Sequence, residues 1–291
     1  MSTENISRSL VFFAKDIKIS HSIFALPFAA AGVLLSNIKG YSFFELFLLL
    51  LCMISARSFA MGINRIVDRK IDKKNDRTKT RQIPMLKLQT WQASFWVSLS
   101  ALIFCSASFA FNFETGVLSV LVLFILGFYS WWKRFSWACH FYLGFCLGLS
   151  PIAAEIALSH ELSFVVFLLG LSICLWTAGF DIIYAIQDLE FDRKHGLYSI
   201  PARFGVQKSI LISRILFLAM ILFLLTIGII KANSFIYFFG VGIISLILVY
   251  QHILVRKISK DNCQKQINKA FFDVNSWVSV IYFFTLILDK I

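Results

Sequence analysis

The stretch FFELFLLLLCMISARSFAMGI, residues 43–63, is long and apolar enough to cross a bilayer as one helix. The chain of 291 residues holds further stretches of this kind, and 58% of its residues are hydrophobic while 15% are charged. A soluble domain of this size needs much less apolar surface. We therefore predict an all-α, polytopic membrane protein with nine spans. The expected spans cover residues 19–35, 43–63, 91–111, 116–132, 135–158, 162–183, 209–230, 235–255 and 271–288.

The basic residues indicate how this chain is oriented in the membrane. The 28 Lys and Arg residues fall before the first span or in the connections after the second, fourth, sixth and eighth spans, except for Lys39, Arg57, Arg214, Lys231 and Lys290. The positive-inside rule then predicts a cytoplasmic N-terminus and a C-terminus on the outside. Because this asymmetry accounts for the net charge of +12, no nucleic-acid partner is expected.

No linker, low-complexity tract or soluble domain is visible, so residues 1–291 are predicted to form a single membrane domain. Residues 1–18 form an N-terminal cytoplasmic segment, and residues 9–18 within it can form an amphipathic helix on the membrane surface. Two connections, 64–90 and 184–208, are unusually long and polar, and both lie on the cytoplasmic side of the predicted topology.

Each long connection begins with an acidic motif, NRIVDRKID at residues 64–72 and YAIQDLEFD at residues 184–192. A single Asp at a helix end is commonly solvated or paired with a nearby Lys or Arg. Two matching motifs on one side of the membrane favour a functional site, because ionisable groups near membrane depth are costly. Residues four or seven apart share a helix face, so each motif projects a column of side chains. The columns are Arg57, Met61, Asn64, Asp68 and Asp72, and Asp181, Tyr184, Asp188 and Asp192.

Columns of carboxylates that face each other repel unless cations lie between them. Mg²⁺ is commonly held by one or two carboxylates, with water and substrate phosphate completing its shell. Basic residues on the same side would then bind a diphosphate together with the metal. Taken one at a time, each of these basic residues is also what the positive-inside rule predicts. The basic set is Arg77, Arg81, Lys133, Arg134, Lys194 and Arg203.

These motifs resemble the UbiA superfamily of intramembrane aromatic prenyltransferases, in its 4-hydroxybenzoate polyprenyltransferase-like branch. NRIVDRKIDKKNDRTKTRQIP (64–84) is similar to the family's first N-x3-D-x3-D motif, and DIIYAIQDLEFDRKHGLYSIPARFG (181–205) to its second, D-x3-D. YSWWKRFSW (129–137) resembles the Y-x3-K-R-F segment, and KISHSIFALPFA (18–29) the first span. The resemblance implies nine transmembrane helices around a central cavity in the bacterial inner membrane, with caps from the two cytoplasmic motif loops.

The resemblance also implies roles for individual residues. Arg57 is expected to pair with the carboxylate of an aromatic acid. Asp181 lines the same cavity and is a candidate for the catalytic base, whose identity stays open. Mg²⁺ and the reacting diphosphate would be held by the catalytic carboxylates and one amide: Asn64, Asp68, Asp72, Asp188 and Asp192. Further contacts to the diphosphate substrate are expected from Arg77, Arg81, Lys133, Tyr129 and Tyr184.

The implied reaction is Mg²⁺-dependent transfer of a polyprenyl group from polyprenyl diphosphate to an aromatic acid. We expect 4-hydroxybenzoate rather than 1,4-dihydroxy-6-naphthoate as the acceptor, and either product would feed ubiquinone or menaquinone synthesis. A cation-coupled transporter is the alternative from another class, but both motifs sit at one membrane face rather than at the midplane. The expected partners are the two substrates and the lipid bilayer, and no obligate protein partner is evident.

Overall fold

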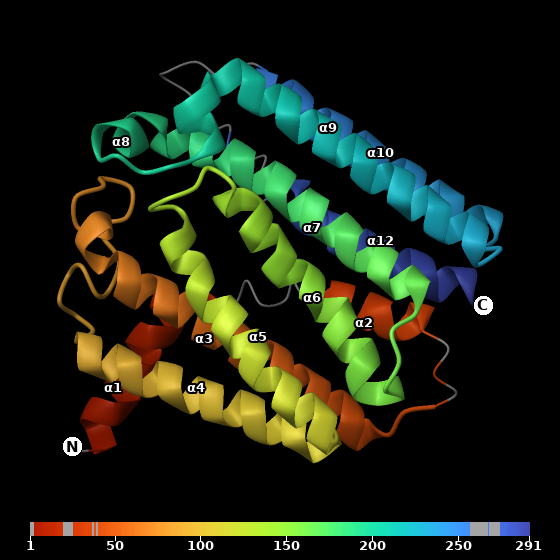
Figure 1. Ribbon diagram of the computed structural model, residues 1–291, viewed down its shortest axis with the longest axis horizontal. Coiled ribbons are helices and arrows are strands. Elements are labelled where there is room, and N and C mark those ends of the chain that lie inside the picture. Colours follow the sequence, from red (N-terminus) through yellow and green to blue (C-terminus); the bar gives the residue numbers. More distant parts are fainter. Residues whose placement is uncertain (1–2, 20–25, 37, 39, 257–266, 268–273) are drawn as a thin grey trace. The chain divides into compact units, whose positions relative to one another are not determined.

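The computed structural model of the chain describes residues 3–19, 26–36, 38, 40–256, 267 and 274–291 (Figure 1). All its regular elements in these ranges are helices, so the predicted all-α architecture is confirmed for this part of the chain. The helices form two compact units, each of which is described by itself. The first comprises Met1–Ile23 and Gly40–Trp131, and the second comprises Phe24–Lys39 and Trp132–Ile291.

In the first unit, one long helix carries the first acidic motif. It begins with a capping box, in which Ser42 Oγ accepts from Glu45 N at 3.2 Å and Glu45 Oε2 accepts from Ser42 N at 2.6 Å. At Gly62 this helix closely approaches its neighbour, since a Cβ there would lie only 2.4 Å from Val97. The helices of this unit are α1 (Thr3–Asp16), α3 (Phe43–Asp72), α4 (Thr90–Phe111) and α5 (Phe113–Trp132). Helix α3 packs against both α4 and α1.

The second unit is arranged around the helix that leads to the second acidic motif. This helix, α7, packs against α6 on one side and α9 on another, and most of its side chains are buried. The unit contains α2 (Leu26–Leu35), α6 (Cys139–Ser159), α7 (Phe164–Ala185), a 3₁₀ turn η2 (Ile186–Asp188), α8 (Leu189–Lys194), α9 (Ile200–Ile230), α10 (Phe235–Arg256) and α12 (Ser276–Asp289).

Small residues let α6 and α7 approach closely. A Cβ at Gly144 would lie 2.3 Å from the Cys174 carbonyl oxygen, and one at Gly148 would lie 2.5 Å from that of Gly170. The far end of the pair is held by Glu155, whose Oε2 accepts from Ser163 N at 2.9 Å where α7 begins. The carboxylate of Glu155 therefore binds the N-terminus of α7.

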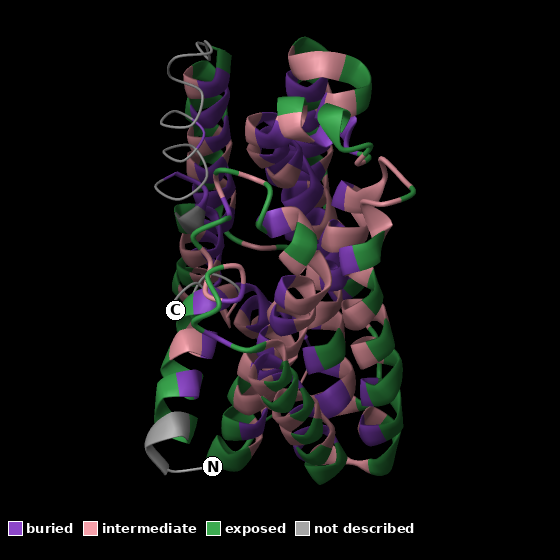
Figure 2. Cartoon of the chain, turned by 90° about the vertical axis from the view of Figure 1, so that its left-hand side faces the viewer, coloured by how far each residue is buried: buried purple, intermediate pink, exposed green. Residues whose placement is uncertain are grey.

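Seven helices in the described ranges are long and apolar enough to cross a membrane, and they correspond to the second through eighth expected spans. Exposed residues, drawn green in Figure 2, occur along the long helices, as expected of surfaces that lipid covers. The first and ninth expected spans, 19–35 and 271–288, overlap the shorter apolar helices α2 and α12. Their remaining parts fall partly on residues outside the described ranges, so the count of nine stays a prediction.

The two connections expected to be loops are partly helical. Residues 64–72 continue α3 without a break, and the connection 184–208 contains η2, α8 and the start of α9. Ser199 explains the early start of α9, because its side chain caps the helix and Pro201 occupies a position in the first turn. Gly205 interrupts this helix with φ 78°, a conformation that glycine adopts without strain. The polar connections therefore contain helical residues, and for 64–72 the helix agrees with the column predicted for the first motif.

Candidate active site

The first motif forms a hydrogen-bonded row along α3. Asn64 Nδ2 donates to Asp68 Oδ2 at 2.8 Å, and Arg65 Nη1 donates to Asn64 Oδ1 at 2.7 Å. Asn64 and Asp68 are one helical turn apart, as the column on this helix predicted. The amide of Asn64 thus orients the carboxylate of Asp68 and is itself oriented by the buried guanidinium of Arg65.

Asp72, the last residue of α3, is paired with a basic residue of the following segment. Arg81 Nη1 lies 2.6 Å from Asp72 Oδ2, and Thr78 Oγ1 donates to the Asp72 carbonyl oxygen at 3.1 Å. The Asp72 carboxylate is buried, whereas the Arg81 side chain is partly exposed. Arg77 lies in the same segment, where its backbone N donates to Asn75 Oδ1 at 3.0 Å. The structure therefore brings Arg81 to the first motif, while contacts of Arg77 or Arg81 with a diphosphate stay a prediction.

Tyr129 of α5 faces the motif side of α3. Its hydroxyl donates to the Met61 sulfur at 3.9 Å. Met61 and Asp68 are seven residues apart and so share a helix face. Tyr129 therefore contacts the column on α3 at Met61, and its contact with a diphosphate stays a prediction.

The N-terminal helix α1 ends against α3, which the sequence reasoning missed. Arg65 Nε donates to the Asp16 carbonyl oxygen at 2.9 Å, and Arg57 Nη1 donates to the Ile17 carbonyl oxygen at 3.3 Å. Asp16 Oδ1 accepts from Gln82 N at 2.7 Å. Burial raises the pKa of Asp16, because lost solvation outweighs the bond from Gln82 and the nearby guanidinium charges.

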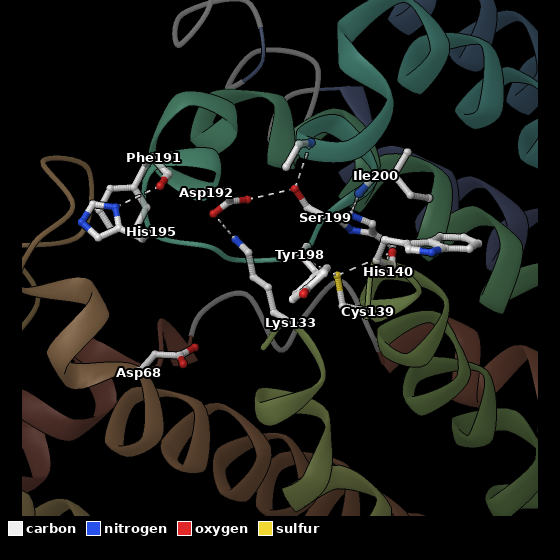
Figure 3. A network of polar contacts seen from close by, with 12 residues as sticks. Asp68, Lys133, Cys139, His140, Phe191, Asp192, His195, Tyr198, Ser199 and Ile200 are labelled. Carbon is white, nitrogen blue, oxygen red and sulfur yellow. Dashed lines mark hydrogen bonds and ion pairs between the residues drawn. The ribbon is translucent and has the colours of Figure 1, made fainter. Parts of the chain in front are cut away.

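In the second unit, Asp192 is the buried carboxylate that anchors Lys133. Its Oδ1 lies 2.8 Å from Lys133 Nζ, and its Oδ2 accepts from Ser199 Oγ at 3.0 Å (Figure 3). The backbone reinforces this contact, since Tyr198 N donates to the Lys133 carbonyl oxygen at 2.8 Å. Burial opposes the charge of Lys133, but Asp192 and Asp188 outweigh it and hold the pKa of Lys133 above its ordinary value.

The second motif is not one continuous column. Asp181 and Tyr184 lie on α7, Asp188 ends the 3₁₀ turn η2, and Asp192 lies on α8. A 3₁₀ turn has about 3.0 residues per turn rather than 3.6, so the α-helical rule for a shared face does not continue past Tyr184. The α-helical column expected from Asp181 to Asp192 is therefore wrong beyond Tyr184. Asp188 and Asp192 are still close enough that both charges act on Lys133. Tyr184 packs against the hydrophobic core of its unit, and its substrate role stays a prediction.

Asp181 has a partner that the sequence reasoning did not identify. His140, in the first turn of α6, places Nδ1 at 2.6 Å from Asp181 Oδ2. Its Nε2 accepts from Ile200 N at 3.2 Å, at the start of α9 (Figure 3). The only signal available in the sequence was a histidine six residues after Arg134, and nothing in the spacing related it to Asp181.

The side chains of both motifs are chemically suited to Mg²⁺. Carboxylate and amide oxygens are the hard donors that this ion prefers, and it commonly keeps water and substrate phosphate in its shell. Within the described residues of each unit, no three His, Cys, Asp or Glu side chains gather closely enough to bind a metal ion. Each motif supplies oxygen donors of the kind that Mg²⁺ prefers, and binding of the ion by them stays a prediction.

Comparison with known proteins identifies the family. The family model described as "UbiA prenyltransferase family" matches residues 25–277. A 4-hydroxybenzoate octaprenyltransferase of Francisella tularensis subsp. novicida is 31% identical over 82% of this chain and 82% of that protein. One of Marinobacter nauticus is 27% identical over 86% of this chain and 83% of that protein. The chain therefore belongs to the UbiA prenyltransferase family.

Solved structures agree with this result. An apo UbiA homologue from Aeropyrum pernix K1 has a TM-score of 0.84 and 28% identity, covering 94% of this chain and 99% of that one. A UbiA homologue from Archaeoglobus fulgidus, solved with GPP and Mg²⁺, has a TM-score of 0.69. At 18% identity over 95% of this chain and 99% of that one, the second likeness shows the fold alone. The predicted polytopic membrane fold and prenyltransferase class are confirmed.

Proposed function

We propose that this enzyme transfers a polyprenyl group from polyprenyl diphosphate to an aromatic acid, most favourably 4-hydroxybenzoate, in respiratory quinone synthesis. The relatives named 4-hydroxybenzoate octaprenyltransferase support this choice of acceptor. One observation carries the proposal. In each unit a motif carboxylate lies against a basic side chain, Asp72 against Arg81 and Asp192 against Lys133. Such a pair places a ligand for a divalent cation beside a cation for phosphate.

In this proposal both motifs bind the same diphosphate. Mg²⁺ would be held by Asn64, Asp68, Asp72, Asp188 and Asp192, and when bound it would neutralise charge on the leaving diphosphate. Lys133 and the Arg77 and Arg81 guanidiniums bind the remaining phosphate oxygens, with Tyr129 and Tyr184 beside them. These contacts stabilise the charge that develops as the diphosphate departs.

The transfer breaks one bond and forms another. The allylic C1–O bond breaks, and its electron pair leaves with the diphosphate. The aromatic carbon next to the phenol hydroxyl bonds to C1, and the proton of that carbon passes to a carboxylate, which we assign to Asp181. Arg57 binds the carboxylate of the acid and so orients the ring. The site must exclude water, which would otherwise capture the allylic cation.

The asymmetry of Lys and Arg supports placement in a bacterial inner membrane with the N-terminus in the cytoplasm. Both motifs then face the cytoplasm, where the water-soluble aromatic acid and the diphosphate are available. A C-terminus on the outside follows if the chain crosses the membrane nine times.

A reconstituted assay tests this function. Purified protein in lipid nanodiscs is mixed with Mg²⁺, geranyl diphosphate and either 4-hydroxybenzoate or 1,4-dihydroxy-6-naphthoate, and products are identified by mass spectrometry. We expect prenylated 4-hydroxybenzoate, no product with EDTA, and a loss of at least about 10²-fold in kcat for Asp68→Ala and Asp188→Ala.

Three other outcomes would contradict the acceptor, the function or the metal assignment. Prenylation of the naphthoate alone would replace the acceptor. Failure to prenylate either acid with any prenyl diphosphate would refute the proposed function, and full activity of either alanine variant would refute the metal assignment.

A further inference from the structure

His140 is a buried imidazole with two defined hydrogen-bond partners. Only 2% of the residue is exposed. Its Nδ1 lies 2.6 Å from Asp181 Oδ2, and its Nε2 lies 3.2 Å from Ile200 N (Figure 3). The ring therefore joins α6 to a carboxylate of α7 and to the first residue of α9.

These two contacts determine the tautomer of the ring. The Ile200 amide can only donate, so Nε2 must accept and carries no proton. The single ring proton is then on Nδ1 and is donated to Asp181. The start of α9 reinforces this state, because the first amides of a helix carry partial positive charge and disfavour a second proton on Nε2. In this arrangement His140 donates from Nδ1 to Asp181 and accepts at Nε2 from Ile200.

Asp181 and Asp192, two carboxylates of this unit, differ in how many of their oxygens are engaged. Both oxygens of Asp192 are engaged, one by Lys133 and one by Ser199, and the side chain is fully buried. Asp181 has one oxygen bonded to His140, and a quarter of its side chain is exposed. Within the described part of the second unit, Oδ1 of Asp181 has no hydrogen-bond partner. One oxygen is fixed, and the other can accept a proton.

The same short segment supports both networks. Ser199, which holds Asp192, is directly followed by Ile200, whose amide holds His140. The start of α9 therefore fixes Lys133 through Asp192 on one side and Asp181 through His140 on the other. A phosphate-binding lysine and a candidate base are thus positioned by one rigid helix end.

We propose that His140 is a positioning residue for the transfer, holding the Asp181 carboxylate so that its open oxygen accepts the proton that leaves the aromatic ring. This inference rests on the proposed function. His140 does not itself contact the reacting atoms, and the proton ends on Asp181 Oδ1 before release to water. The net products are the prenylated acid, diphosphate and one proton.

Two substitutions at His140 each remove one of its two hydrogen bonds and keep the other. His140→Asn places an amide nitrogen near the position of Nδ1, so it keeps the donor to Asp181 and loses the acceptor for Ile200. His140→Gln reaches the position of Nε2, so it keeps the acceptor for Ile200 and loses the donor to Asp181. His252→Gln is a matched control, because His252 is a buried imidazole of the same unit that bonds the Leu248 carbonyl oxygen of its own helix.

We expect His140→Gln to lower kcat about 10–100-fold with an unchanged KM for geranyl diphosphate, since displacing a catalytic group by about 1 Å can cost about 10²-fold. The kcat of His140→Asn should be about tenfold higher than that of His140→Gln. Its Tm should be lower than that of the wild type, because the buried Ile200 amide has lost its acceptor. His252→Gln should keep the wild-type kcat. Equal kcat values in the two His140 variants, or kcat values that follow Tm, would overturn the inference.

A spectroscopic measurement tests the same inference without turnover. ¹⁵N spectra of histidine-labelled protein should show a neutral ring protonated at Nδ1 whose signals are lost in His140→Gln and kept in His252→Gln. If the signals lost in His140→Gln are those of a doubly protonated ring, or of a ring with its proton on Nε2, the assignment is overturned. If the wild type prenylates no acid, the proposed function fails and this inference fails with it. If the wild type is active and His140→Gln is equally active, only this inference fails.

Discussion

Asp72 and Asp192 end the two acidic motifs, and each lies buried against one basic side chain. A charge buried without a partner is costly, so removing one member of either pair is expected to destabilise the fold. Their positions in the two motifs are equivalent, which the spacing of the motifs predicted. The identity of the partners was not predictable, because Arg81 and Lys133 are only two of many basic residues in these connections.

The Lys133–Asp192 pair gives a prediction about stability and pH. Lys133→Met should lower the free energy of unfolding by about 1–3 kcal/mol, less than for a fully buried pair because 35% of the lysine side chain is exposed. The pKa of Lys133 in the folded protein is raised above 10.5. The pair therefore contributes its full stabilisation below that pH, and this stabilisation is lost only as the pH rises through the pKa of the folded state.

Denaturation of the wild type and of Lys133→Met, followed over a range of pH, checks this prediction. The difference in the free energy of unfolding between the wild type and Lys133→Met should be constant near neutral pH and should narrow above pH 10.5. The double variant Lys133→Met with Asp192→Asn should regain stability without regaining activity, since no buried charge is left unpaired. A difference that already vanishes near neutral pH would contradict the assigned pair.

At the scale of elements, the long helices could be predicted from hydrophobic runs, and the connections could not. Residues 64–72 are polar in composition, yet α3 continues through them to Asp72, in agreement with the column predicted for the first motif. The 3₁₀ turn η2 and the short helix α8 leave no clear hydrophobic period, so the expected column from Asp181 to Asp192 was wrong beyond Tyr184. His140 was missed because its partners come from two other helices.

The start of α9 carries a prediction at this scale. Ser199 caps α9 by accepting from Ala202 N at 3.2 Å, and its hydroxyl also holds Asp192. Ser163 caps α7 in the same way, accepting from Val166 N at 3.3 Å, at the opposite end of that helix from Asp181. Either serine replaced by alanine should cost about 1 kcal/mol of stability through the lost cap.

Only Ser199→Ala should also impair the reaction, because it releases one oxygen of the carboxylate that anchors Lys133. We expect its kcat/KM to fall about tenfold, the size of one lost hydrogen bond to a charged group. Ser163→Ala serves as the control, with unchanged kcat/KM and a similar decrease in Tm. Equal kinetic parameters in the two variants would show that Ser199 is a cap and nothing more.

At the scale of the whole molecule, family membership and membrane fold agree with the composition, the charge asymmetry and the order of the motifs. Each compact unit carries one acidic motif with its own basic partner. In the function proposed above, the two motifs act on one substrate molecule, because the departing diphosphate must be bound and water excluded. Hydrophobic patterns predict most of the long helices, and only the chemistry of the motifs suggests that the two motifs cooperate.

The stoichiometry of substrate binding tests this central claim most directly. Geranyl S-thiolodiphosphate, an unreactive analogue of the donor, is titrated calorimetrically into nanodisc-embedded protein in the presence of Mg²⁺. We predict that one analogue binds per chain. Asp68→Ala alone and Asp188→Ala alone should each abolish this binding, and the double variant should behave like either single variant. Two analogues bound per wild-type chain, or one still bound when either carboxylate is removed, would mean that the motifs form separate sites and would contradict the account.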